Sequence, residues 1–311
     1  MKTQISNIRS SLARSLLATT IAFTMAGSLA AHAADGAQKT FDSPEAAAKA
    51  LATAARTDDE AALTEILGPS WKDVLGSGDA AADKAALDAF VAKYDQMNRW
   101  TTMTDGTRVL YIGADNYPYP VPLARDGAST WHFDSAAGER EVRVRRIGAN
   151  ELLAIDAVDV IANAEEAYLG GARDGQTAAY AGAIVSSDGK HDGLYWAVAE
   201  SESPSPLAAL GNLTAQSALA EPLILDGYRY RILDAQGDTA SGGAKSYIEN
   251  GVMSAGFAVL ASPVDYGKSG IMTFMLSREG VVYQKDLGEE TVNVAAAIDA
   301  YEPGDGWTSV E

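Results

Sequence analysis

The chain of 311 residues contains no cysteine. Thiol nucleophiles, disulfides, iron–sulfur clusters and thiolate zinc sites are therefore excluded. Histidine is scarce as well, because only His32, His132 and His191 occur. Without disulfides the stability must come from packing, and the chain is long enough to bury a sizeable core.

Basic residues are few in comparison with acidic ones. The sequence has 24 Lys and Arg against 42 Asp and Glu, which gives a formal net charge of −18. Nucleic acids and anionic lipid surfaces repel a chain of this charge, so neither is predicted as a partner. Hydrophobic residues make up 47% of the sequence, which indicates a globular protein and not a disordered one.

Residues 1–33 have the three parts of a secretory signal peptide. The positive region contains Lys2, Arg9 and Arg14. An apolar region at 15–30 follows, and it is shorter than the roughly 20 residues that a membrane span needs. We predict cleavage after Ala33, a leader at 34–40, and a soluble periplasmic or secreted chain without stable membrane insertion. Loss of three basic residues and no acidic one would bring the net charge from −18 to −21.

Three helices are predicted in the first hundred residues. The first covers 43–56 and is capped by Ser43 or Asp42, with proline in its first turn. The others cover 58–67 and 80–97, and apolar residues in the last recur at spacings of three and four.

Antiparallel hairpins are predicted after these helices. An Asp-Gly pair in the middle of 100–112 is typical of a hairpin turn. Three prolines in 116–123 indicate an extended segment at a sheet edge. A second hairpin is predicted between 131–134 and 140–147, because valine and arginine alternate in the latter segment.

The rest of the chain is predicted as a long helix followed by strands. The helix covers 150–169, with Asn150 as its cap and a Gly-Gly pair at its end. Strands are predicted at 227–233, 257–261, 270–277 and 280–285. The fold class is therefore α+β, with an N-terminal module at 41–148 and a C-terminal module of helix and antiparallel sheet at 149–311.

The loop at 186–196, SSDGKHDGLYW, is the first candidate site. Its candidate residues are Asp188, His191, Asp192, Tyr195 and Trp196. Histidine beside carboxylates is typical of general-base and metal sites. Both aspartates precede glycine, however, which is typical of turns in which aspartate bonds its own backbone. We favour two successive turns that deliver the aromatic residues into a buried seam, and a site remains the alternative.

A second candidate lies where basic residues gather, between 140 and 151. Its candidate residues are Arg145, Arg146, Asn150 and Glu151. An acidic ligand or partner would be attracted to the arginines. The alternative is that the arginines pair with carboxylates of a neighbouring strand.

No complete catalytic motif occurs in the sequence. The glycine–serine segments at 76–78 and 267–270 miss the G-x-S-x-G spacing of a nucleophile elbow. Phosphate-binding loops and the calcium loop of an EF-hand are absent as well. We therefore predict no catalytic residue, no cofactor and no metal.

Seven segments form an ordered set along the chain. They are FDSPEAAAKAL (41–51), LGSGD (75–79), YPYPVPL (117–123), WHFDSAAGEREVRVRRIGANEL (131–152), GKHDGLYW (189–196), GYRYRILDAQG (227–237) and GFAVLASPVDYGKSGIMTFMLSREGVVYQKDLG (256–288). This set resembles the domain of unknown function 2950 family of exported bacterial proteins. Tyr117 stands where the family tends to have Trp, and Glu165 where it tends to have Gln. The resemblance implies export and a common fold, and it assigns no catalytic residue.

Two further resemblances concern parts of the chain. The pattern of glycine, tyrosine and proline over 227–288 is similar to the globular β-sheet of type IV pilins and pseudopilins. The exposed apolar helix by which pilins assemble is missing before it, so the resemblance implies a pilin-like sheet that does not polymerise in the pilin manner. The helices at 43–69 resemble those of nuclear-transport-factor-like cone domains.

Three hypotheses about function follow. The leading one is a non-enzymatic envelope protein that binds another envelope protein or supports its assembly. The second is a hydrolase of cell-envelope glycan or peptide, with His191 and Asp192 in the site and Arg146 as an electrostatic aid. The third is a carrier of a small ligand, with an apolar pocket lined by Tyr94, Trp100 and Trp131.

Overall fold

The computed structural model describes residues 38–127, 129–175, 177–196, 204–210 and 222–310. The predicted signal peptide at 1–33 and its cleavage site lie outside the described residues. Among the residues described, no helix combines the length and the apolar character that crossing a bilayer requires.

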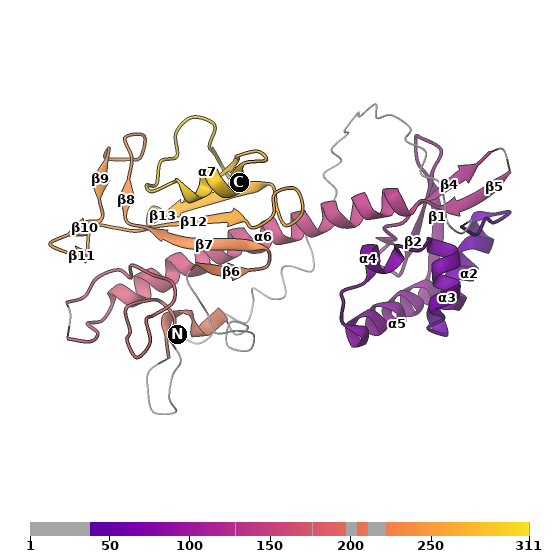
Figure 1. Ribbon diagram of the computed structural model, residues 1–311, viewed down its shortest axis with the longest axis horizontal. Helices are drawn as coiled ribbons and strands as arrows, with labels where there is room; N and C mark the ends of the chain where they lie inside the picture. Colours follow the sequence, from indigo (N-terminus) through magenta and orange to yellow (C-terminus); the bar gives the residue numbers. More distant parts are fainter. Residues whose placement is uncertain (1–37, 128, 176, 197–203, 211–221, 311) are drawn as a thin grey trace. The chain divides into compact units, whose positions relative to one another are not determined.

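The first helices begin where their capping residues predict. They are α2 (Pro44–Arg56), α3 (Glu60–Leu67), α4 (Trp71–Leu75) and α5 (Ala80–Gln96) (Figure 1). The side chains of Ser43, Asp59 and Asp79 accept main-chain N–H groups at the starts of α2, α3 and α5. The three predicted helices are confirmed, and α4 is an additional short one.

An antiparallel sheet follows these helices. Its strands are β1 (Asn98–Thr102), β2 (Arg108–Ile112), β3 (Tyr117–Pro118), β4 (Leu123–Asp126) and β5 (Thr130–Phe133), in the order β1-β2-β4-β5 with β3 on β2. The predicted hairpin is confirmed, with Trp100 opposite Leu110. The proline-rich segment contributes only the two-residue strand β3.

The predicted hairpin between 131–134 and 140–147 is wrong. Strand β5 pairs with β4 instead, with Leu123 opposite Phe133. Helix α6 (Ser135–Leu169) then begins at a cap formed by Asp134, whose side chain accepts the N–H of Ala137. The alternating Val and Arg residues lie on this helix, where Arg145 reaches Glu141 one turn away at 2.8 Å. A four-residue alternation is too short to exclude a helix that is stabilised by such i,i+4 pairs.

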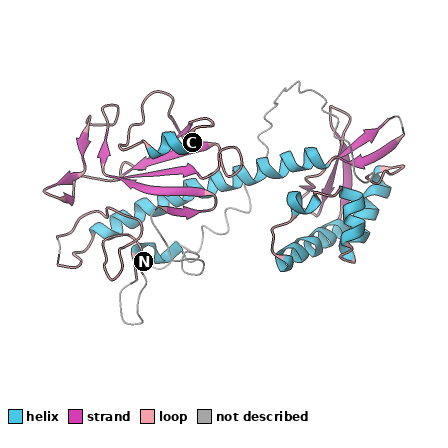
Figure 2. Cartoon of the chain, viewed as in Figure 1, coloured by secondary structure: helices cyan, strands magenta, loops and turns pink. Residues whose placement is uncertain are grey.

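The C-terminal half of α6 packs against a six-stranded antiparallel sheet (Figures 1 and 2). The sheet contains β6 (Leu223–Leu225), β7 (Tyr228–Leu233), β12 (Ala258–Pro263), β13 (Met272–Ser277), β14 (Val282–Asp286) and β15 (Thr308–Ser309), in the order β15-β14-β13-β12-β7-β6. The four strands predicted in this region are confirmed. On α6 the buried side chains include Ala154, Val158 and Ile161, whereas Leu153 is 40% exposed.

The remaining elements are short. They are η2 (Pro206–Leu210), β8 (Ala235–Gln236), β9 (Lys245–Ser246), β10 (Ile248–Glu249), β11 (Val252–Met253) and α7 (Thr291–Ala296). Helix α7 contacts β12, and the Arg231 guanidinium donates to the carbonyls of Ala295 and Ile298 at the end of α7. All six residues of β12 are buried, as expected of a central strand that is covered on both faces.

The described residues form two hydrophobic cores. We call the cluster built from α2, α3, α4 and β2–β5 the first core, and the cluster built from α6 and the six-stranded sheet the second core. The α+β class is therefore correct. The predicted module boundary at 148/149 falls inside α6, so this helix belongs to both predicted modules.

Candidate functional site

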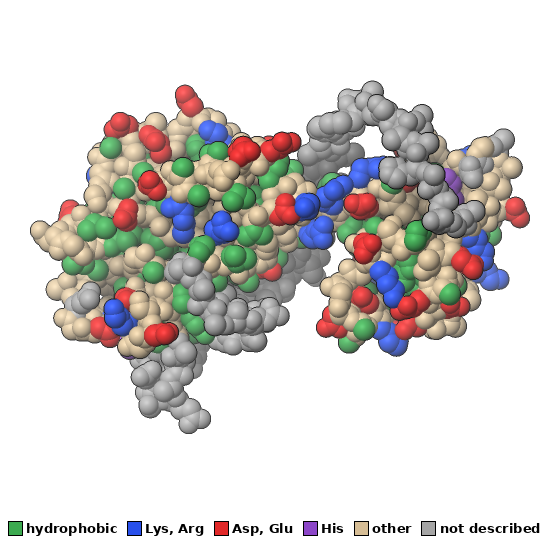
Figure 3. Space-filling view, in the orientation of Figure 1, with side chains coloured by type: hydrophobic (Ala, Val, Ile, Leu, Met, Phe, Trp, Pro, Cys, Tyr) green, Lys and Arg blue, Asp and Glu red, His purple; other side chains and the backbone are tan. Residues whose placement is uncertain are grey.

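Arg145, one of the sequence candidates, ties α6 to the proline-rich segment. Its Nη1 donates to the carbonyl of Pro118 at 2.8 Å and to the hydroxyl of Tyr117 at 3.1 Å. The guanidinium also lies over the Tyr117 ring, 5.3 Å from its centroid. Figure 3 shows basic side chains gathered over α6, and Arg146 is among the exposed residues there. The contacts of Arg145 are structural, and Arg146 remains exposed.

Asn150 and Glu151 bind main-chain atoms of the second sheet. The Asn150 amide donates to the carbonyl of Ser269 at 2.8 Å. Glu151 accepts the N–H groups of Ile271 and Met272 at 2.9 and 3.0 Å. Asn150 was predicted to cap a helix and lies instead inside α6, where it helps to hold the start of β13.

Asp188 and Asp192 lie in the loop as the turn interpretation predicts. Asp188 is exposed, and the next residue, Gly189, has a φ of +72°, which favours glycine. The Asp192 carboxylate accepts the N–H of Ser187 at 2.7 Å. Neither carboxylate contacts the His191 ring through a recorded hydrogen bond, so the sequence neighbours of this histidine are not its partners.

The partner of His191 is Asp174, seventeen residues earlier in the chain. Nδ1 of the ring lies 2.9 Å from Oδ1 of Asp174, and the His191 N–H donates to Oδ2 at 2.8 Å. These hydrogen bonds lower the pKa of Asp174, so it is a carboxylate near neutrality. Sequence reasoning missed Asp174, whose only signal was an Asp-Gly pair at 174–175 of the kind that also marks ordinary turns.

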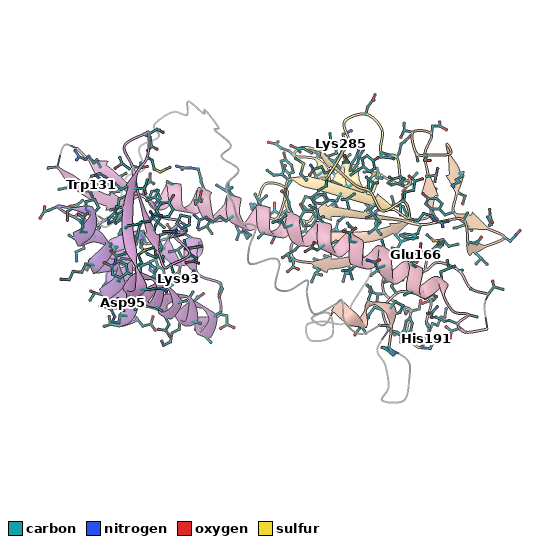
Figure 4. The ribbon with its side chains drawn as sticks, turned by 180° about the vertical axis from the view of Figure 1, so that it is seen from behind. Lys93, Asp95, Trp131, Glu166, His191 and Lys285 are labelled. Carbon is teal, nitrogen blue, oxygen red and sulfur yellow. The ribbon has the colours of Figure 1, made fainter. Side chains whose placement is uncertain are left out.

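His191, labelled in Figure 4, also contacts aromatic residues, and a basic residue lies over their rings. The ring of Trp196 meets it edge to face, with centroids 4.8 Å apart, and the Tyr168 hydroxyl donates to the His191 carbonyl at 2.6 Å. The Arg173 guanidinium lies over both aromatic rings, at 4.2 Å from Tyr168 and 5.8 Å from Trp196. Tyr195 packs against the second core, as the predicted buried seam requires.

A pocket of about 290 Å³ contains this pair. Its polar lining includes Tyr168, Arg173, Asp174, His191, Asp192 and Asp234. The His191 side chain is 33% exposed, so its ring is open to solvent and not enclosed in the core. Of the five loop candidates, His191 and Asp192 line the pocket, whereas Asp188, Tyr195 and Trp196 do not. We call it the His191 pocket.

A second, apolar cavity of about 360 Å³ lies in the first core. Helices α2, α3, α4 and α5 line it together with β2 and the segment 117–120. Only Asp83 and Lys93 among its lining residues are charged. Its apolar and aromatic lining side chains include Leu51, Leu63, Trp71, Leu87, Phe90 and Tyr119. We call it the α5 cavity.

Helix α5 covers the cavity without being buried itself. None of its seventeen residues is fully buried, although Leu87 and Phe90 pack against the first core. Its charged lining residues are already engaged. Lys93 pairs with Asp115 at 2.5 Å, and Asp83 accepts the N–H and hydroxyl of Ser77 at 2.6 and 2.7 Å.

Tyr119 is the buried polar side chain of the α5 cavity. It is 9% exposed, and its ring packs against those of Phe90 and Phe133. Burial raises the pKa of the phenol, so the hydroxyl stays neutral. The pocket expected from the sequence, lined by Tyr94, Trp100 and Trp131, is not the one found, since none of these residues lines the cavity.

Glu165 is a carboxylic acid buried outside both pockets. Its side chain has no exposed surface, one oxygen accepts the N–H of Ala181 at 2.7 Å, and the other has no hydrogen-bond partner. Burial raises the pKa of Glu165 to about 8. The carboxyl is therefore neutral over most of the physiological range and attaches the segment around Ala181 to α6.

Comparison with known proteins identifies the family of the chain and assigns no activity to it. Within the described ranges, no group of three or more His, Asp or Glu side chains is placed to hold a metal ion. No curated protein and no solved structure matches the chain, so the resemblance to pilin sheets stays a prediction. One family model, Protein of unknown function (DUF2950), matches residues 38–310 and so covers nearly every residue of both cores. The chain belongs to this family.

Proposed function

We propose that this chain is a binding protein that takes a small, largely apolar molecule into the α5 cavity. The observation that carries the proposal is the cavity itself, which has a volume of about 360 Å³ and an almost wholly apolar lining. Ligand sites are concave and mostly apolar, with few polar groups, and start near 300 Å³. The carrier hypothesis from the sequence is thereby favoured, in a different place from the one it named.

An apolar ligand gains free energy in such a cavity for two reasons. It leaves water, which contributes about 25 cal/mol for each Å² of apolar surface buried. It also supplies contact partners to Leu63, Phe90 and other lining side chains that lack them on the cavity side. A well-packed core offers neither gain, because its side chains already fill the space.

The polar groups of the lining suggest a neutral ligand with one hydrogen-bonding atom. Lys93 and Asp83 already have partners, so a charged ligand would have to displace Asp115 or Ser77. Tyr119 lines the cavity, and its hydroxyl offers a hydrogen bond to an oxygen or nitrogen of the ligand.

The proposal retains the predicted setting of the protein. With its signal peptide removed, an acidic and cysteine-free chain would work in the periplasm or outside the cell. Binding there would be non-enzymatic, as in the leading sequence hypothesis. Assembly with another envelope protein remains an alternative, and recovery of a stoichiometric protein partner from periplasmic extract would favour it.

Fluorescence titration with N-phenyl-1-naphthylamine, a neutral apolar dye, tests the proposal. We expect saturable binding of one dye per chain, with quenching of tryptophan emission because Trp71 lines the cavity. Ala55, a buried residue of α2, also lines it, so Ala55→Phe should fill the space and weaken binding about tenfold or more.

Ala46→Phe is the matched control, because Ala46 lies on the same helix and is exposed to solvent. This variant should bind the dye as the parent chain does. The proposal is wrong if the parent shows no saturable binding, or if Ala55→Phe folds and still binds with unchanged affinity. Native mass spectrometry of the purified chain would then identify the natural ligand by its mass.

A further inference from the structure

The His191 pocket has a feature that a simple loop contact does not require. Asp174 accepts two hydrogen bonds from one residue, from the ring and from the main-chain N–H of His191. The two bonds fix both the position of the residue and the rotation of its ring. Asp174 itself has a φ of +52°, a conformation that costs energy in a residue other than glycine.

The same contact decides which ring nitrogen carries the proton. Asp174 is a carboxylate, because its hydrogen bonds from His191 lower its pKa. A carboxylate only accepts, so in neutral imidazole the proton lies on Nδ1 and Nε2 keeps its lone pair. Nε2 makes no hydrogen bond within the part of the chain that the structure describes. It is therefore a free base in a pocket of about 290 Å³.

Among the residues that the structure describes, no protein hydroxyl is hydrogen-bonded to this base. The Tyr168 hydroxyl donates to the His191 carbonyl, and the Tyr180 hydroxyl lies 3.3 Å from Glu166. Thr177 lines the pocket and makes no recorded hydrogen bond to the ring. Water is therefore the nucleophile that fits the arrangement, in contrast to a serine triad.

We propose that His191 is a general base that activates water for hydrolysis of an acyl substrate, and that Asp174 is its positioning residue. Nε2 takes a proton from water while the water oxygen forms a bond to the acyl carbon and the carbonyl electrons move to oxygen. The tetrahedral species then collapses and breaks the bond to the leaving group. The leaving alcohol or amine takes the proton from imidazolium, so acid and alcohol or amine are the products.

The charges around the pocket select the substrate class. Asp174, Asp192 and Asp234 line it against the single cation Arg173. Anionic substrates are repelled by this balance, and neutral or cationic ones are accepted. The Nη1 of Arg173 donates to the carbonyls of Tyr168 and Gly171. The remaining N–H groups of the guanidinium are available to stabilise the developing oxyanion.

Nitrogen NMR of the histidine rings tests the arrangement without any substrate. In the parent chain His191 should be the Nδ1–H tautomer, with the bare Nε2 shift. Asp174→Asn retains an oxygen to accept a hydrogen bond and adds an NH₂ that donates to Nδ1, so it should convert the ring to Nε2–H. An Nε2–H ring in the parent chain overturns the proposal, and His132 provides the internal reference.

Hydrolysis of p-nitrophenyl acetate, a neutral ester, tests the chemistry. We expect His191→Gln and Asp174→Asn each to lower the rate by about 100-fold, with melting temperatures near that of the parent. His132→Gln is the control and should keep the parent rate. Acetylcholine, an ester with a cationic alcohol, should be cleaved faster than a succinate monoester of a neutral alkyl alcohol, whose acyl part is anionic.

The proposal is overturned if the parent chain hydrolyses the neutral ester no faster than His191→Gln does. It is independent of the α5 cavity, because none of the residues in the His191 pocket lines that cavity. Dye binding by His191→Gln should equal that of the parent. Failure of either proposal therefore leaves the other unaffected.

Discussion

The two cores differ in how completely helices cover their sheets. In the second core, β12 is buried along its whole length, and large side chains such as Phe274 and Tyr228 have almost no exposed surface. In the first core, α5 has no buried residue and leaves a cavity of about 360 Å³. Both cores are built from the same kinds of residue, yet the central strand of the second is buried and the covering helix of the first is not.

The difference lies in how deeply the covering helix is buried. Helix α6 buries Val158, Ile161 and several alanines against its sheet. Helix α5 lines the cavity with Ala86, Leu87, Ala89 and Phe90, and none of its residues is fully buried. A helix that does not pack closely against its sheet leaves space that a well-packed interior would fill.

The largest effect should come from matched truncations in the two cores. Phe274→Ala removes a ring that is 1% exposed and packs against Tyr228, so it should lower the free energy of unfolding by roughly 3–5 kcal/mol. Phe90→Ala on the partly buried α5 should cost about 1 kcal/mol. Urea denaturation measures both. Equal costs would contradict the view that only the second core is fully packed.

Glu165 should give the second core a distinctive pH dependence. Its pKa is raised from 4.5 to about 8, so the stabilisation is complete below pH 4.5 and is lost as the pH rises through 8. The change amounts to roughly 4 kcal/mol. Glu165→Gln should remove it, so the parent should lose stability relative to this variant between pH 5 and 8.5. Urea denaturation of both chains at pH 5 and 8.5 measures the effect. If the difference in the free energy of unfolding between parent and variant is the same at both pH values, Glu165 is charged in the folded state and the prediction is wrong.

The two halves of α6 should respond differently to loss of a glutamate. Glu151→Ala deprives two main-chain N–H groups of their acceptor and should cost about 2 kcal/mol. Glu141→Ala breaks an exposed pair with Arg145 and should cost less than about 0.5 kcal/mol. Thermal unfolding of both variants checks the comparison. A larger loss of stability for Glu141→Ala than for Glu151→Ala would contradict this expectation and would show that α6 is held more strongly at its first half.

The smallest effect is expected where α5 meets α2. Arg56 donates to both oxygens of Asp95 at 2.6 and 2.8 Å, and both side chains are about half exposed. Arg56→Ala should therefore lower stability by less than about 1 kcal/mol. Hydrogen exchange should nevertheless become faster in α5 than in α2 or the second core. Uniformly unchanged exchange would show that this ion pair does not hold the helix over the cavity.

Local features of the chain could be predicted wherever one short segment decides them. Ser43, Asp59 and Asp79 cap their helices because a cap needs only the residues that follow it. The hairpin that pairs Trp100 with Leu110 follows from its own Asp-Gly turn. The same applies to the turns around Asp188 and Asp192, which the glycines after them indicate.

Features that join distant segments could not be predicted in this way. The start of α6 is an exception, because the short hairpin of β4 and β5 and the Asp134 cap decide it locally, and the Val–Arg alternation is a misleading signal there. Asp174 was missed because seventeen residues separate it from His191, and the α5 cavity because its lining comes from six elements.

The sequence by itself determined the α+β class, the family, the starts of the first helices and the absence of thiol chemistry. Each of these depends on composition or on residues within a few positions of one another. The tertiary structure alone decided that His191 is oriented by Asp174 and that α5 covers an apolar cavity. Partners and empty volume depend on where the whole chain places its side chains, which no local pattern encodes.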